Sequence, residues 1–298
     1  MPTASGPIPL QPAPTTTVSV QSLGSGSSGN AFLIEYGQAS LLLDCGVGIR
    51  TISRALQQRQ RRLADLDGIL ITHEHSDHIR TLPCLAGLDV PIVATAGTQR
   101  YLPLPDAQWQ SIRASTSVAI AGMTVWAVRV DHDAAEPCGY LIEAGSTRVS
   151  IFTDLGRWDE RLAEPIGASD LVVLEANHDE EMLRRGPYPI YLKRRVASAK
   201  GHLSNIECGT SLADTLRHAP GAPDIWLAHL SNTNNTPGVA HDTVTRALHC
   251  ADLGLPVTAL PRTTPGPVWR RDAGPGEEAW QPSRPVTVVS QLGLDIGG

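Results

Sequence analysis

The feature that most constrains this chain is a run of histidine and acidic residues that directly follows a short apolar stretch. Residues 68–72 are apolar and predict a strand, and the next six residues read His73-Glu74-His75-Ser76-Asp77-His78. Neutral imidazole is a good ligand for zinc and related ions, and carboxylates join it where a metal polarises water. A loop that turns at the end of this strand can direct the first two histidines to one ion, and the aspartate and the third histidine to its neighbour. The alternative is a polar surface loop that happens to be rich in histidine.

Two residues after other predicted strands complete a set of side chains large enough for two ions. His132 follows a strand predicted at residues 125–130, and Asp154 ends a strand predicted at residues 149–153. Two cations held roughly 3.5–4 Å apart need a shared carboxylate, and Asp154 is well placed to be that bridge. The alternatives are a satisfied loop histidine at position 132 and a turn or helix-capping aspartate at position 154.

The order of the predicted elements favours a layered α/β fold. Strands or hairpins are predicted at residues 17–23, 31–36, 40–43, 68–72, 91–94, 118–130, 139–152, 171–175, 225–229 and 256–260, and helices at 49–66, 208–218 and 239–253. Strands come first and strand–helix alternation follows, which favours α/β layers over an all-β barrel.

The two ends of the chain differ in composition from the rest. Residues 1–16 contain five prolines and few large apolar groups, which predicts a disordered N-terminal lead. Residues 261–298 are rich in proline and glycine and predict an irregular C-terminal tail, in which residues 286–289 are a candidate last strand. Residues 17–260 are then the folded domain.

Composition excludes several classes of protein. A net charge of −6 and an aromatic content of 4% argue against a globally basic or stacking-dominated nucleic-acid binder, so an anionic substrate must meet a local patch. Five scattered cysteines without a Cys-x-x-Cys pair are typical of reduced thiols in a cytosolic protein. No apolar run reaches the roughly 18 residues that span a bilayer, and no signal-peptide pattern opens the chain. We therefore expect a cytoplasmic protein with no membrane partner.

The pattern His73-x-His75-x-Asp77-His78, followed by His132, Asp154 and a later histidine, resembles the metallo-β-lactamase superfamily. The resemblance spans residues 17–260 and implies an αββα sandwich with metals at one edge. Residues 43–46 match the family's first signature, in which Asp44 would support a ligand rather than bind metal. Iron-binding redox members of the superfamily place a glutamate where His75 stands, so this histidine indicates hydrolysis.

Further stretches resemble the YycJ/WalJ-type proteins of this superfamily. They are, in chain order, Ser25-Gly26-Ser27-Ser28-Gly29-Asn30, Leu174-Glu175-Ala176-Asn177-His178, Gly186-Pro187-Tyr188-Pro189, Gly201-His202-Leu203-Ser204-Asn205 and His229-Leu230-Ser231-x-x-Asn234-Asn235. The likeness implies a metal-dependent nuclease, reported for the family as a DNA exonuclease. Ribonuclease Z is a more distant resemblance. By that analogy His202 is the catalytic proton donor, held by Glu175, and His229 is the last metal ligand.

The segment between Asp154 and His229 is short and basic. Its 75 positions (229 − 154) are far fewer than in nucleases with a large cap domain, so no cap of the ribonuclease J type is expected. Between residues 183 and 200 no acidic residue accompanies the basic ones, which are Arg184, Arg185, Lys193, Arg194, Arg195 and Lys200. Basic charge beside a catalytic edge would let an acidic protein hold phosphates, and we assign residues 193–195 to substrate binding. The alternative is an ordinary solvated helix face.

The loop at residues 25–30 is a candidate phosphate-binding loop. Glycines at positions 24, 26 and 29 allow the backbone to approach an anion closely. The loop also offers three side-chain donors, Ser27, Ser28 and Asn30. Such a pocket accepts a terminal phosphate dianion better than an internal diester, which predicts attack on DNA from a 5′-phosphorylated end. The alternative is a flexible connection between two strands.

The predicted reaction is phosphodiester hydrolysis by a water molecule that two divalent ions, zinc or manganese, activate. Asp77 would orient or deprotonate that water, and His202 would protonate the departing oxygen. One set of alternatives is a ribonuclease, or a thioesterase or lactonase of the same fold that has no need of the basic segment. A different class is a non-catalytic binding protein that keeps its metals for stability.

Overall fold

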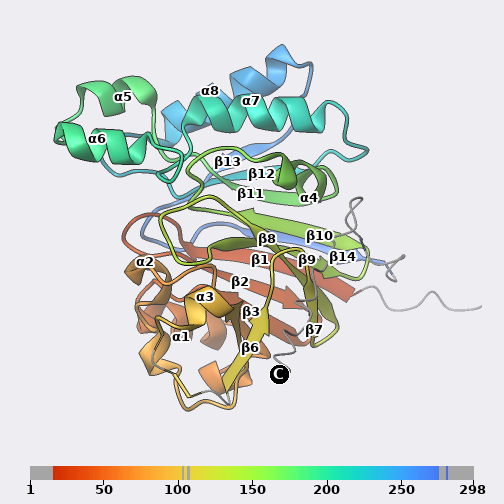
Figure 1. Cartoon of the computed structure of the whole chain (residues 1–298). Helices are drawn as coiled ribbons and strands as arrows, with labels where there is room; N and C mark the ends of the chain where they lie inside the picture. The colour runs from red at the N-terminus through yellow and green to blue at the C-terminus, as the bar shows by residue number, and fades with distance from the viewer. Residues whose placement is uncertain (1–15, 103, 106–107, 275–279, 281–298) are drawn as a thin grey trace, which may run out of the picture.

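This computed structural model describes residues 16–102, 104–105, 108–274 and 280. Two seven-stranded sheets pack face to face in it (Figure 1). The first sheet contains, in spatial order, β14 (Val268–Ala273), β1 (Thr16–Gly24), β2 (Ala31–Tyr36), β3 (Ala39–Leu43), β4 (Gly68–Leu70), β5 (Ile92–Thr95) and β6 (Trp109–Ile112). The second contains β13 (Val257–Ala259), β12 (Asp224–Ala228), β11 (Leu171–Glu175), β10 (Thr147–Phe152), β9 (Cys138–Ala144), β8 (Met123–Arg129) and β7 (Ser117–Ile120).

Helices cover both outer faces of this sandwich (Figure 1). The first sheet carries α1 (Ile49–Gln57), α2 (Ser76–Ile79), α3 (Ala96–Gln99) and the short 3₁₀ turns Leu63–Asp65 and Leu82–Cys84. The second carries the 3₁₀ turn Glu160–Leu162 with α4 (Ala163–Gly167), α5 (Glu180–Arg185), α6 (Ile190–Val196), α7 (Asn205–Leu216) and α8 (Pro237–Cys250). None of these helices, within the described residues, has the length and apolar character needed to cross a membrane. The predicted αββα sandwich is confirmed, and the part of the chain that the structure describes adds no large cap domain to it.

The last three positions of β3 are all apolar because the sheet is covered on both faces there. In β3, Leu41 and Leu43 belong to the apolar cluster between the two sheets, whereas Leu42 belongs to the cluster under α1. All three side chains are fully buried. Successive side chains of a strand point to opposite faces, so a strand buried on both sides needs an apolar residue at each position. A third cluster fills the space between the second sheet and helices α7 and α8.

The strand directions bring several loops to one edge of the sandwich. Strands β3 and β4 run parallel in the first sheet, and β10, β11 and β12 run parallel in the second. Strand β8 is antiparallel to β9, which is antiparallel to β10, so β8 points the same way as β10. The carboxyl ends of these strands therefore lie at the same edge, which is where open α/β sheets place their ligands.

Two sequence-based expectations about secondary structure are wrong. The helix predicted for residues 49–66 ends at Gln57, because residues 58–62 are all Gln or Arg and offer no apolar side chain to the sheet. The irregular tail predicted after residue 261 contains a strand, β14, which pairs antiparallel with β1 along Thr16–Gln21. The exposed edge of β1 would otherwise leave its backbone groups unpaired. The candidate strand at residues 286–289, and all but the last residue of the predicted N-terminal lead, lie outside the described residues.

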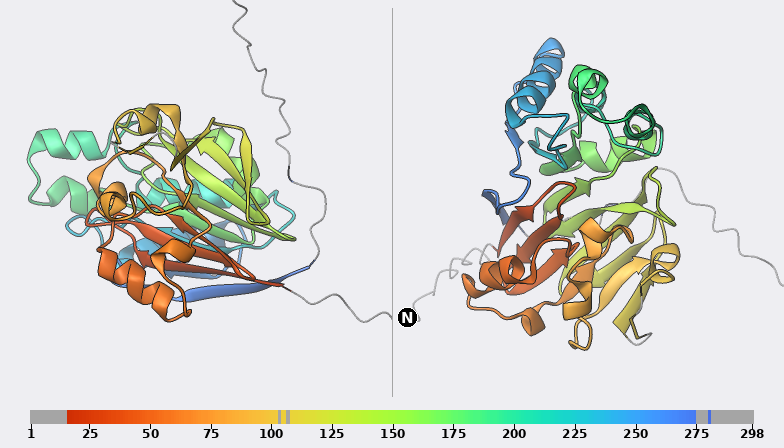
Figure 2. Two further views of the ribbon diagram at one scale, coloured as in Figure 1. Left: turned by 90° about the horizontal axis from the view of Figure 1, so that it is seen from below. Right: turned by 90° about the vertical axis from the view of Figure 1, so that its left-hand side faces the viewer.

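Helices α5 and α6 form a small projection at the edge where α2 also lies. The views in Figures 1 and 2 both place this pair beyond the ends of the strands. The Asp179 side chain caps the N-terminus of α5 by accepting a hydrogen bond from the backbone N–H of Met182. The glycine and proline residues of 186–189 separate the two helices. The basic segment singled out in the sequence is therefore carried next to the strand-end loops.

Candidate metal centre and active site

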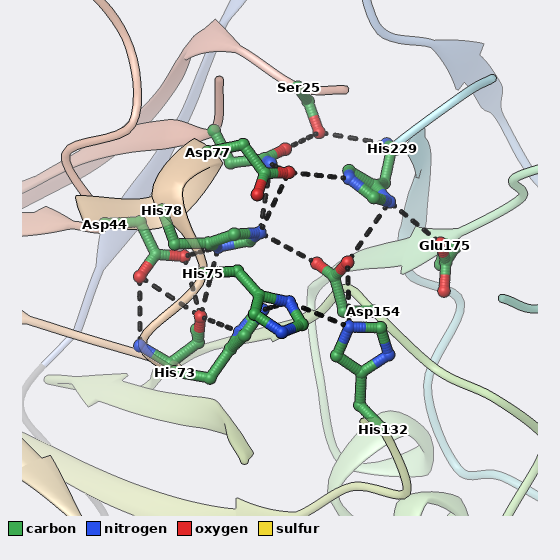
Figure 3. A network of polar contacts seen from close by, with 12 residues as sticks. Ser25, Asp44, His73, His75, Asp77, His78, His132, Asp154, Glu175 and His229 are labelled. Atoms are coloured by element: carbon green, nitrogen blue, oxygen red, sulfur yellow. Dashed lines mark hydrogen bonds and ion pairs between the residues drawn. The ribbon is translucent and has the colours of Figure 1, made fainter. Parts of the chain in front are cut away.

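The seven predicted metal ligands lie together at the strand-end edge (Figure 3). His73 and His75 are in the loop after β4, and Asp77 and His78 are in the first turns of α2. Three more residues follow strands of the second sheet: His132 after β8, Asp154 after β10 and His229 after β12. The loop after β4 and α2, from the first sheet, thus face the loops after β8, β10 and β12, from the second sheet, across this edge.

The backbone turns sharply at two of these positions and at Asp44, which contacts His78. Asp44, Asp154 and His229 have φ angles of 57°, 57° and 53°, in the left-handed region that residues other than glycine rarely occupy. Each such residue costs on the order of 1–3 kcal/mol and persists only where the surrounding structure requires it. Asp44 and His229 directly follow the buried strands β3 and β12, and Asp154 lies two residues after the end of β10. The turn directs each side chain into the cluster.

The side chains form four overlapping groups, and each group has potential ligand atoms within 4.8 Å of one another: His73, His75 and His132; Asp77, His78 and His229; His73, His78 and Asp154; and Asp154, Glu175, His202 and His229. In the first group His75 Nδ1 is 3.1 Å from His73 Nε2 and 3.3 Å from His132 Nε2. In the second group Asp77 Oδ2 lies 3.7 Å from His78 Nε2 and 3.5 Å from His229 Nε2.

Asp154 lies between the first two groups. One of its carboxylate oxygens is 3.0 Å from His78 Nε2, and the other is 3.7 Å from His132 Nε2. The geometry therefore offers the same division into two ions with a shared carboxylate that the sequence predicted. The assignment of these residues to two ions stays a prediction.

The chemistry of the cluster fits divalent cations. His229 Nε2 is buried and makes no hydrogen bond of good geometry among the described residues, with Asp77 Oδ2 3.5 Å away. Asp154 Oδ2 is also buried and lies 3.0 Å from His78 Nε2, but outside hydrogen-bond geometry. A bound cation would give both atoms a well-directed partner. Burial, with His78 and other histidines nearby, lowers the pKa of His73 well below its usual value, so this imidazole is neutral and its lone pair is available. Although burial alone would raise the pKa of Asp154, the histidines around it, first His229 and His78, hold that pKa well below its usual value.

A second layer of residues fixes the orientation of the predicted ligands. The Asp44 carboxylate accepts a hydrogen bond from His78 Nδ1 at 2.7 Å and another from the backbone N–H of Thr72 at 2.9 Å. This agrees with the supporting role expected of Asp44. The Thr72 hydroxyl also contacts Asp44 and lies 3.1 Å from His73 Nδ1. Sequence reasoning missed Thr72, whose only signal was its place directly before the histidine run.

Glu175 holds two histidines at once. Its Oε1 accepts hydrogen bonds from His202 Nδ1 at 2.8 Å and from His229 Nδ1 at 2.9 Å, and its Oε2 accepts one from the backbone N–H of Leu155 at 2.5 Å. The sequence predicted the first contact and missed the second. Glu175 is fully buried, and its contacts are those of a residue that positions His202 and His229; its predicted part in catalysis stays a prediction. The His202 side chain is 22% exposed and lies 3.8 Å from Asp154.

The predicted phosphate-binding loop divides into an exposed and a buried part. Ser27 and Ser28 are exposed, whereas Asn30 is fully buried. The Asn30 amide oxygen accepts a hydrogen bond from the backbone N–H of Gly26 at 2.9 Å, and its nitrogen lies 3.1 Å from His78 Nε2. Asn30 therefore closes the loop against the seven predicted metal ligands, here called the metal cluster, and does not present a free donor at the surface. Ser25, which sequence reasoning left unassigned, accepts a hydrogen bond from the backbone N–H of His229.

We expect Asn30→Ala to lower the free energy of unfolding by about 2 kcal/mol, because the change leaves buried backbone groups of the loop without partners. Ser28→Ala, in the same loop, is the matched control and should change that free energy by less than about 0.5 kcal/mol. Urea unfolding of the three proteins measures both effects. Equal stability of the two variants would contradict the loop-closing role of Asn30.

Two acidic side chains from outside the basic segment partly neutralise its charge: Glu181, which precedes it closely in the sequence, and Asp133, which is distant in the sequence. Arg184 and Arg185 both pair with Glu181, and Arg195 pairs with Asp133 at 2.6 Å. Asp133 in turn lies 3.2 Å from His132 Nε2, so Arg195 reaches the metal cluster through this carboxylate. Residues 183–200 thus contain no acidic residue, as the sequence indicated, but acidic side chains from other segments contact the arginines of this segment in the fold. Arg194 makes no ion pair within the described part of the chain.

Two cavities flank this segment, and His202 lines both. The smaller, of about 200 Å³, is also lined by Ser27, Asp133, Tyr188, Arg195 and Ser231. The larger, of about 520 Å³, is also lined by His178, Ile190, Lys193, Arg194 and Glu207. Of the predicted substrate-binding residues, the structure therefore places Ser27 and Arg195 together near the metal cluster, and Lys193 and Arg194 on the other side of α6.

Comparisons with known proteins agree with this geometry. The β-lactamase superfamily domain matches residues 40–230. The chain is 36% identical over 245 residues to the exodeoxyribonuclease WalJ of Streptococcus pneumoniae, covering 79% of this chain and 90% of that protein. It is 33% identical over 239 residues to the exodeoxyribonuclease YycJ of Bacillus anthracis, covering 78% and 90%.

Solved structures show the same fold at lower identity. The metallo-β-lactamase fold protein YhfI of Bacillus subtilis superposes with a TM-score of 0.65 at 20% identity, over 86% of this chain and all of that one. The short form of human tRNase Z gives a TM-score of 0.56 at 18% identity, over 83% of this chain and 98% of that one. With the curated relatives and the clustered ligands, these findings identify a metal-dependent hydrolase. The chain therefore belongs to the metallo-β-lactamase superfamily, among the relatives of the WalJ and YycJ proteins.

Proposed function

We propose that this protein is a two-metal DNA exonuclease that hydrolyses DNA from a 5′-phosphorylated end. The observation that carries the proposal is the position of His202. This partly exposed histidine, held by a buried carboxylate, lies beside the metal cluster and lines two cavities with basic residues. The names of the curated relatives support DNA as the substrate.

The predicted ligands would hold two divalent ions, with His73, His75 and His132 at one, Asp77, His78 and His229 at the other, and Asp154 between them. Bound ions of this kind lower the pKa of water and neutralise charge on phosphoryl oxygens. The mixture of imidazole and carboxylate suits zinc and also admits manganese.

The chain's own residues account for the proton transfers. The Asp77 carboxylate is 19% exposed, so it can contact a water molecule, orient it and accept its proton. On the opposite side, Glu175 binds Nδ1 of His202 and leaves Nε2 for the substrate. His202 would then protonate the oxygen that departs from the phosphorus. Glu175 also stabilises the protonated form of His202, since a buried carboxylate next to imidazole favours its charged state.

The preference for a 5′-phosphate rests on the smaller cavity. Ser27 from the Gly/Ser loop and Arg195 from α6 both line it, next to His202. A hydroxyl and a guanidinium together suit a terminal phosphate dianion, which accepts more and stronger hydrogen bonds than an internal diester. A nucleotide fixed in this way would place the next linkage over the metal cluster.

The proposal is tested with three end-labelled or closed DNA duplexes, assayed with zinc and with manganese. Linear DNA with a 5′-phosphate should be degraded about ten-fold or more faster than DNA with a 5′-hydroxyl, the effect of losing a charge-assisted contact, and a closed circle should persist. Degradation of the circle at the rate of the phosphorylated duplex would indicate an endonuclease. Cleavage of RNA alone, or turnover of a thioester alone, would replace the DNA assignment by one of the alternatives.

A further inference from the structure

Helix α6 stands between the two cavities and presents a different face to each. Leu192, Arg195 and Val196 line the smaller cavity, and Ile190, Lys193, Arg194 and Ala197 line the larger one. Residues three and four apart share one face of a helix, so the consecutive basic residues 193–195 are divided between the two sides. His202 is the one basic side chain among the described residues that lines both.

The larger cavity contains a buried histidine that the proposed reaction does not use. His178 is 3% exposed, and its Nδ1 makes no hydrogen bond within the described chain. Its backbone is held firmly, because its carbonyl oxygen accepts a hydrogen bond from the backbone N–H of Asn205 at 2.9 Å. A buried imidazole nitrogen without a partner is destabilising. Because the His178 side chain lines this cavity, a polar ligand that reached this nitrogen would supply the missing partner.

The lining of the larger cavity combines the cations Arg184, Lys193 and Arg194 with the carboxylates Glu180 and Glu207. Arg194 is exposed and makes no ion pair among the described residues, whereas Lys193 donates a hydrogen bond from Nζ to the carbonyl oxygen of Arg184 at 2.7 Å. The preceding turn carries Ile190 and Tyr191, which are 64% and 71% exposed. Large apolar side chains this exposed, beside cations, suit a polynucleotide, whose phosphates need positive charge and whose bases stack on apolar or aromatic surfaces.

We propose that the larger cavity is a second nucleotide subsite, which holds the DNA strand where it continues past the scissile linkage. This inference rests on the proposed function: with the terminal phosphate in the smaller cavity and the linkage beside His202, the strand leaves on the opposite side of α6. Lys193 and Arg194 contact a phosphate of the continuing strand, and His178 donates a hydrogen bond to the same nucleotide. Ile190 and Tyr191 provide the surface against which a base packs.

The test compares a long and a minimal substrate of the same enzyme. The long substrate is a 5′-phosphorylated single strand of about twelve nucleotides, within the range that single-strand sites cover. The minimal one is bis(p-nitrophenyl) phosphate, which has one phosphodiester and no following nucleotide. The double variant Lys193→Gln/Arg194→Gln should lower the ratio of kcat/KM for the long substrate to that for the minimal one about ten-fold, the loss of a charge-assisted contact. The change should be in KM for the strand.

Salt dependence gives a second readout. Loss of the two cations, which contact one phosphate, should flatten the slope of log affinity against log salt by about 0.7, the value for one neutralised phosphate of a single strand. Ile190→Ser, on an exposed side chain, should lower the same kcat/KM ratio without changing the salt slope. Arg185→Gln is the matched control, because Arg185 is exposed on α5, pairs with Glu181 and lines neither cavity.

The outcomes separate this inference from the function on which it rests. If the wild-type protein hydrolyses the minimal substrate but no DNA, the proposed function fails. If it degrades DNA and the double variant keeps both the ratio and the salt slope, the subsite is refuted while the nuclease assignment stands. An equal loss on both substrates would also refute the subsite, since it would assign Lys193 and Arg194 to the support of the reaction centre.

Discussion

Replacing Asp154 with alanine is expected to remove at least one metal equivalent and to lower turnover by more than about 100-fold, the upper range for losing a residue that only supports a ligand. Asp154 is buried, and its two oxygens face His78 and His132, which belong to different ligand groups. Loss of this carboxylate leaves both groups without their shared acidic member. Metal analysis after dialysis, together with a nuclease assay, measures the two effects.

Two controls separate ligand loss from a folding defect. Because Asp154 has a φ of 57°, alanine strains the backbone there, whereas asparagine tolerates this conformation; Asp154→Asn therefore tests the charge with less strain. Asp131→Asn is the matched control, since Asp131 adjoins His132 in sequence but pairs with Arg157. Two full equivalents of metal in Asp154→Ala would rule out the bridging assignment.

For His202→Ala we expect full metal content and a loss of turnover on the order of 10²–10⁴-fold, the usual effect of removing a general acid. His202 is bound to Glu175, is partly exposed and lines both cavities, so it is placed to touch a substrate. Metal analysis and kcat on phosphorylated DNA provide the comparison. Added imidazole should restore part of the activity if the proton donor alone is missing.

The competing assignment makes His202 a metal ligand. Its ring also lies within ligand distance of Asp154, Glu175 and His229, a fourth group that could hold an ion. If the metals leave with the His202 side chain, this histidine is a ligand and the proton donor must be sought elsewhere. Glu175→Gln serves as the partner variant. It weakens the support of both His202 and His229 and should lower turnover and metal content together.

Local sequence was sufficient to predict most of the sandwich. The hairpin turn at Gly37, the hairpins around Gly122 and Gly145 and the buried strands β11 and β12 follow from turn residues and apolar runs, which act over a few positions. The short strand β6 and the edge strand β14 were missed. Both are stabilised by pairing with strands distant in the sequence, and a strand that depends on its neighbour leaves a weak local pattern.

The sequence by itself determined which side chains can bind metal and that they stand at strand ends, because residue chemistry and strand period are local properties. Only the tertiary structure decided which contacts those side chains and their neighbours make. It buried Asn30, joined Glu175 to both His202 and His229, and paired Arg195 with Asp133. It also divided residues 193–195 between two cavities. These contacts join segments up to 62 positions apart, and the packing of two sheets sets their distances, which no local pattern encodes.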